Sequence, residues 1–80
     1  TEERRKELVK LARKHAEECK ISIRHGRRES NEMLDTFKDD GDIPEDDAIR
    51  GKKKIQEMTD EGIKKVDEIV ARKEEDIMEV

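Results

Sequence analysis

The sequence predicts an all-α protein, a long antiparallel helical hairpin. Three observations predict this fold class. Charged residues make up 52% of the 80 residues and aromatic residues only 1%, whereas a β-sandwich or barrel needs many more aromatic and β-branched residues. Apolar residues recur every three or four positions along two long segments, which is the spacing of an amphipathic helix. Between these segments lies a short acidic break with Gly41 and Pro44, residue types that end one helix and begin the next.

The first helix is predicted from about residue 2 to about residue 38, which is about 55 Å at the usual rise per residue. Thr1 is the expected N-cap, and Glu2 and Glu3 suit the positive end of the helix dipole. The row expected to face the second helix has the alternating three–four spacing of a coiled coil. It consists of Leu8, Ala12, His15, Cys19, Ser22 or Ile23, Gly26, Ser30, Met33 and Phe37. Further apolar residues flank this row, so the stripe is wider than one partner helix needs.

The acidic turn covers about residues 39–44, and the second helix is predicted from about 45 to about 78. A connection this short makes the two helices antiparallel neighbours. The inward row of the second helix is Ala48, Lys52, Ile55, Met58 or Thr59, Gly62, Val66, Ile69, Lys73 and Ile77. Gly26 and Gly62 are expected to allow close approach of the helices. Residues 1–80 are therefore interpreted as one hairpin domain.

A cluster of arginines in the first helix is the main candidate for function. Arg24, Arg27 and Arg28 are three and four residues apart, so they share one helix face. Each carries a fixed positive charge and a planar fork of donors that fits phosphate oxygens. On a chain with net charge −4, this cluster predicts an anionic partner. The alternative is an ordinary solvated face whose arginines pair with Glu29 and Glu32.

The other groups of polar residues do not predict a catalytic or metal-binding site. His15 and Cys19 are one helical turn apart and could form half of a zinc site, but the sequence offers no second pair of ligands. They are interpreted as a half-buried pair in the helix interface. The acidic turn lacks the ligand pattern of a calcium loop. A two-helix chain is expected to have no concave cavity for a substrate, so we predict neither an enzyme nor a metal or cofactor site.

Cysteine content and hydropathy bear on the compartment. Cys19 is the single cysteine and has no partner for an internal disulfide, which is typical of a reducing compartment. No apolar stretch is long enough to span a membrane, and no signal-peptide core is present. The sequence therefore predicts a cytoplasmic location.

Several segments, in order, resemble the C-terminal portion of bacterial ribosome recycling factors. The opening residues 1–8 look like the segment that leads into that family's helical domain. Residues 24–29, Arg-His-Gly-Arg-Arg-Glu, resemble its arginine motif, and residues 43–47, Ile-Pro-Glu-Asp-Asp, resemble its last interhelical turn. Residues 55–60, 63–67 and 73–78 resemble its closing helix. His25, Gly26 and Pro44 depart from the usual pattern.

The resemblance implies both a fold and a function. It implies two helices of a three-helix bundle, with the family's first helix and inserted β-rich domain absent from this sequence. It implies contact between Arg24, Arg27 and Arg28 and large-subunit ribosomal RNA. It also implies that the full-length protein splits post-termination ribosomes together with elongation factor G, which the family engages through the inserted domain.

The wide apolar stripes also predict self-association. Two hairpins could cover each other's stripes in a four-helix bundle with two-fold symmetry. The expected homodimer buries Leu8, Ile23, Phe37, Ile55, Val66 and Ile69. The competing functional hypothesis is thus a self-associating structural module that binds no RNA.

Overall fold

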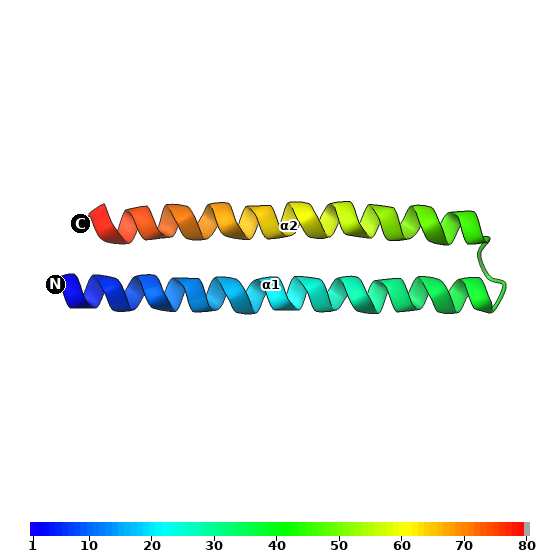
Figure 1. The fold of residues 1–80 in the computed structure, drawn as a ribbon, viewed down its shortest axis with the longest axis horizontal. Coiled ribbons are helices and arrows are strands. Elements are labelled where there is room, and N and C mark those ends of the chain that lie inside the picture. The colour runs from blue at the N-terminus through cyan, green and yellow to red at the C-terminus, as the bar shows by residue number, and fades with distance from the viewer. Residues whose placement is uncertain (80) are drawn as a thin grey trace.

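The protein is a hairpin of two long antiparallel helices, as seen in a computed structural model that describes residues 1–79. Helix α1 spans Glu2–Asp39 and helix α2 spans Glu45–Glu79, with both chain ends at one end of the hairpin and the turn at the other (Figure 1). The predicted all-α fold is confirmed. The Cα atoms fill a slab of 60 × 15 × 9 Å, which is a single layer of two helices. Val80, the last residue of the predicted domain, lies outside the described part.

The ends of α1 are capped by the residues that the sequence indicated. The Thr1 side-chain oxygen accepts a hydrogen bond from the backbone N–H of Arg4 at 3.3 Å. At the other end, Gly41 adopts a positive φ of 78°, which glycine tolerates because it has no Cβ. The backbone N–H of Asp42 then donates to the carbonyl of Phe37 at 2.8 Å, and that of Gly41 donates to Lys38 at 3.0 Å. This pair of bonds is the Schellman motif, which turns the chain toward α2.

The interface between the helices is narrow. Within residues 1–79 only Ala48 and Thr59 are buried, at 2% and 6% exposure. Thr59 satisfies its hydroxyl by donating to the carbonyl of Ile55 at 2.8 Å. Other interface residues are half-buried, namely Val9, Ala16, Ile23, Leu34, Ile55, Val66 and Val70. A single interface of this kind leaves most apolar side chains in contact with water.

The predicted inward rows are partly wrong. In α1 the row that faces α2 includes Ala16 and Leu34, one residue later than the predicted His15 and Met33, and of the two predicted alternatives Ile23 faces α2 and Ser22 is exposed. The expected row is instead largely exposed, including Leu8, His15, Cys19, Met33 and Phe37. In α2, Thr59 is buried rather than Met58, and Ile69 and Lys73 are exposed. Both rows have three–four spacing, so periodicity alone could not distinguish them.

The close approach of the helices occurs at Gly51 rather than at Gly26. A Cβ at Gly51 would lie 2.9 Å from Cδ1 of Leu34, whereas a Cβ at Gly26 would meet nothing within 4 Å. The expectation for Gly26 is therefore wrong. Gly62 does face α1, because a Cβ there would lie 3.6 Å from Cδ1 of Ile23.

Over the described length, neither helix combines the length and apolar character that crossing a membrane requires.

Candidate nucleic-acid interface

The three arginines lie near the middle of α1, within little more than one helical turn. Arg24 and Arg27 are half-buried, and Arg28 is exposed. The first three atoms of an arginine side chain are apolar carbons, so partial burial can hold the stem against the protein while the guanidinium keeps its donors outward. The site therefore presents fixed charges from a regular helix rather than from a loop.

None of the three arginines forms an ion pair within residues 1–79. The alternative prediction paired them with Glu29 and Glu32. Glu29 instead lies 3.1 Å from Nε2 of His25, one turn earlier. Glu32 makes no ion pair in the described chain, although its backbone carbonyl accepts a hydrogen bond from Thr36 at 3.0 Å. The guanidinium donors of the cluster are thus left available to an external acceptor.

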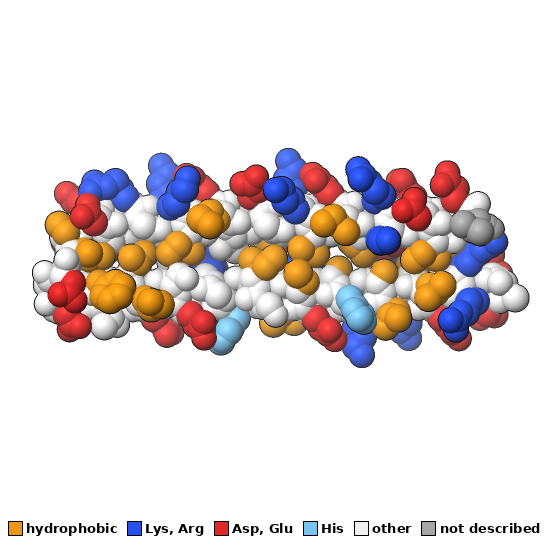
Figure 2. All heavy atoms as spheres, turned by 180° about the vertical axis from the view of Figure 1, so that it is seen from behind, with side chains coloured by type: hydrophobic (Ala, Val, Ile, Leu, Met, Phe, Trp, Pro, Cys, Tyr) orange, Lys and Arg blue, Asp and Glu red, His pale blue; other side chains and the backbone are white. Residues whose placement is uncertain are grey.

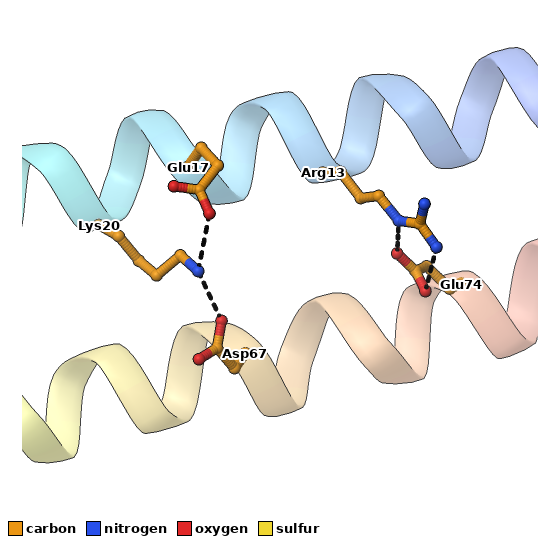
Figure 3. A network of polar contacts seen from close by, with 5 residues as sticks. All are labelled: Arg13, Glu17, Lys20, Asp67 and Glu74. Carbon is orange, nitrogen blue, oxygen red and sulfur yellow. Dashed lines mark hydrogen bonds and ion pairs between the residues drawn. The ribbon is translucent and has the colours of Figure 1, made fainter.

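Other cations at the helix interface form ion pairs with carboxylates of the opposite helix. Arg13 donates to both carboxylate oxygens of Glu74, and Lys20 lies between Glu17 and Asp67, at 2.9 and 2.8 Å (Figure 3). Lys52 Nζ lies 2.5 Å from the carboxylate of Asp35 in the same way. The contrast with the arginine cluster is clear, because these cations have their charges balanced within the hairpin.

The ion pairs shift the pKa values of Arg13, Lys20, Asp35 and Glu74 toward the charged form. The hydrogen bond to Glu74 raises the pKa of Arg13 and, reciprocally, lowers the pKa of Glu74. The hydrogen bond to Asp67, followed by that to Glu17, raises the pKa of Lys20. The hydrogen bond from Lys52 lowers the pKa of the Asp35 carboxyl. The three ion pairs thus link α1 to α2 along the hairpin.

Arg27 borders a shallow hollow between the helices. The hollow has a volume of about 220 Å³, and its other lining residues are Ile23, Gly26, Ser30, Ile55, Met58 and Thr59. The absence of a side chain at Gly26 leaves this side of Arg27 open. The middle of the hairpin therefore combines a guanidinium that has no ion pair among the described residues with an accessible surface beside it.

His15 and Cys19 lie in a different place from the one predicted. Both are exposed rather than half-buried, and both line an open groove of about 460 Å³ between the N-terminal half of α1 and the C-terminal half of α2. The rest of the groove wall is mainly apolar, formed by Leu8, Leu11, Ala12, Ala16, Val66, Ile69, Val70 and Lys73. In Figure 2, hydrophobic side chains follow the line between the helices, and charged side chains occupy the outer edges.

This groove corrects the expectation that the chain has no concave cavity. The sequence signal that could have located it was the excess width of the apolar stripes, which showed that a second apolar surface had to exist. Residues 1–79 contain no group of three or more histidine, cysteine, aspartate or glutamate side chains placed to hold a metal ion. With its apolar lining, the groove fits another apolar surface better than a charged ligand.

Comparison with known sequences assigns the family. The sequence profile described as "Ribosome recycling factor" matches residues 1–78. The chain belongs to the ribosome recycling factor family. It is 51% identical over 80 residues to the ribosome-recycling factor of Sorangium cellulosum and 53% identical over 79 residues to that of Desulfatibacillum aliphaticivorans. The corresponding protein of Bacillus velezensis is 48% identical over 80 residues.

These matches extend over nearly all of this chain but over only part of each ribosome-recycling factor. They include 99–100% of the chain and 43% of each of the three relatives. The chain thus spans less than half the length of the curated relatives it matches. The resemblance drawn from the arginine motif, the turn and the closing helix is confirmed at the level of the family.

Proposed function

We propose that this chain is the RNA-binding helical part of a ribosome recycling factor. In this proposal Arg24, Arg27 and Arg28 contact phosphates of large-subunit ribosomal RNA. Membership in the family supports a role in ribosome recycling. The observation that carries the assignment to these residues is that all three arginines lack an ion pair within residues 1–79, whereas Arg13, about three turns earlier in the same helix, is paired with Glu74.

The chemistry of this cluster is suited to phosphate groups. A guanidinium donates two parallel hydrogen bonds to phosphate oxygens, and these charge-assisted bonds are stronger than neutral ones. Successive phosphates of an RNA strand form a row of negative charges, which a rigid helix can contact at fixed spacing. Since such contacts carry little sequence information, the arginines would position the protein on the ribosome.

The wider activity follows from the family. We propose that the full-length protein splits post-termination ribosomes together with elongation factor G, and that it does so in the cytoplasm as a binding factor rather than as an enzyme. The RNA contact of the helical hairpin would anchor the factor on the large subunit. We propose no residue of this chain as a contact for elongation factor G.

The test is a charge deletion at the arginine cluster in the full-length protein. Arg27→Ala should weaken binding to purified large ribosomal subunits by about 1–3 kcal/mol, because a charge-assisted contact is lost. It should also reduce the dependence of log Kd on log salt by about one counterion. Arg50→Ala is the matched control, because it removes the same charge from a residue that already pairs with Asp47. Equal affinities for wild type and Arg27→Ala at low salt would refute the assignment.

Self-association is the second candidate function, favoured by the open groove. The groove exposes apolar side chains on both helices, including Leu8 at 38% and Ile69 at 62%. A continuous apolar surface of this kind is typical of an interaction site. We propose that, in the chain alone, a second copy covers the groove and forms a homodimeric four-helix bundle.

Two equally exposed isoleucines make a controlled test of the homodimer. Ile69→Glu places a charge in the groove and should convert the dimer to monomer in sedimentation experiments. Ile21→Glu makes the same change at a residue that is 61% exposed and does not line the groove, so the dimer should persist. A wild-type chain that sediments as a fully helical monomer over a hundredfold range of concentration would exclude this second function.

A further inference from the structure

The interhelical ion pairs follow one register that has a gap at the arginine cluster. From one pair to the next, the residue number in α1 increases by the same amount by which the residue number in α2 decreases. The pairs are Arg13–Glu74, Lys20–Asp67 and Asp35–Lys52. Moving seven residues on from Lys20 and seven back from Asp67 reaches Arg27 and Asp60. These two residues have opposite charges and occupy the position of the missing pair.

The carboxylate at this position is engaged by a neighbour on its own helix. Asp60 Oδ1 accepts a hydrogen bond from Nε2 of Gln56 at 2.9 Å, one turn earlier in α2. Arg27 forms no ion pair with any residue between Thr1 and Glu79, and it lines the hollow beside Gly26 and Met58. Asp60, the acidic residue that this register places opposite Arg27, is therefore hydrogen-bonded to an amide of its own helix instead.

A second observation concerns the residue that this register places opposite Gln56. The same register places Asn31 opposite Gln56, four residues before Asp35 and four after Lys52. The side-chain oxygen of Asn31 is buried and has no hydrogen-bond partner in the described chain. A buried acceptor without a donor is unfavourable. If Gln56 turned to donate to Asn31, this oxygen would be satisfied and Asp60 would be released toward Arg27.

We infer that Gln56 is a positioning residue for the arginine site, because it holds Asp60 away from Arg27 and so keeps this guanidinium free for a phosphate. The inference rests on the proposed RNA-binding function and assigns a regulating carboxylate to that site. When Asp60 pairs with Arg27, RNA phosphate must displace a carboxylate of the protein itself. A partly exposed ion pair of this type lowers affinity about two- to fivefold.

Ribosome binding provides the first readout. In the full-length protein, Gln56→Ala should weaken binding to large subunits about two- to fivefold, because it frees Asp60 to pair with Arg27. Adding Asp60→Asn to this variant should restore the wild-type affinity. Adding Asp42→Asn instead is the matched control, since it removes the same negative charge from the turn and should restore nothing. Equal rescue by both asparagine substitutions would overturn the inference in favour of a general charge effect.

A readout without ribosomes separates this inference from the proposed function. Phenylglyoxal modifies guanidinium groups, and mass spectrometry of peptides can follow Arg27 while Arg28 serves as an internal reference. Gln56→Ala should slow modification of Arg27 relative to Arg28, and the additional Asp60→Asn should reverse this. An unchanged Arg27 rate in Gln56→Ala would overturn the inference. The expected protection together with wild-type ribosome binding by Arg27→Ala would instead refute the proposed function and leave the pairing of Arg27 with Asp60 intact.

Discussion

Replacing Gly26 by alanine should stabilise the hairpin, although Gly26 lies inside a functional segment. Glycine inside a helix is less favourable than alanine by about 1 kcal/mol, because its unfolded backbone has more freedom to lose. A Cβ at this position meets no atom within 4 Å, so no steric cost offsets the gain. We expect the free energy of unfolding to rise by about 1 kcal/mol and Tm to rise by about 4–8 °C for a chain of this size.

Gly51→Ala is the matched control, since it offers the same gain in helix propensity. Here the new Cβ would lie 2.9 Å from Cδ1 of Leu34, so this side chain must shift, and a shift of its χ angles by about 30° costs about 0.5–1.5 kcal/mol. The net change should be close to zero. Urea denaturation followed by far-ultraviolet circular dichroism measures both variants, at one protein concentration and with the oligomeric state checked by sedimentation. Equal stabilisation of both, or destabilisation by Gly26→Ala, would refute the steric reasoning.

Two further predictions concern acid stability and the thiol. The pKa of Glu74 and of Asp35 is lowered by their cationic partners, so these ion pairs stabilise the fold above the ordinary carboxyl pKa of about 4 and lose this contribution as pH falls through the folded pKa. Glu74→Gln should therefore flatten the acid loss of stability in urea titrations, whereas Glu75→Gln, an exposed neighbour, should follow the wild type; identical curves for both would contradict this. Cys19 lines the open groove of the single hairpin, so in the monomeric Ile69→Glu variant Cys19→Ala should barely change stability, and the thiol should react stoichiometrically with a maleimide. A thiol of this variant that reacts only after unfolding would contradict the exposure of Cys19.

Much of this protein was determined by local sequence. The N-cap at Thr1, the glycine that reverses the chain at Gly41, and the two long amphipathic segments are local features, so the sequence alone was sufficient to predict the hairpin. The spacing of Arg24, Arg27 and Arg28 is likewise fixed by helix geometry. The family could also be recognised from motifs in these segments.

Only the tertiary structure decided which apolar stripe of each helix meets the other. The row through Leu8 and Cys19 and the row through Ala16 and Ile23 have the same periodicity, and a wide stripe contains both. Which row faces the other helix depends on contacts across the interface. The Leu34 side chain packs against Gly51, which has no side chain, and charged residues such as Lys20 form ion pairs with carboxylates of α2. Pairing partners from the other helix are invisible in the local pattern. The structure was therefore required to show that the interface cations form ion pairs with carboxylates, whereas the three arginines of the cluster form none within residues 1–79.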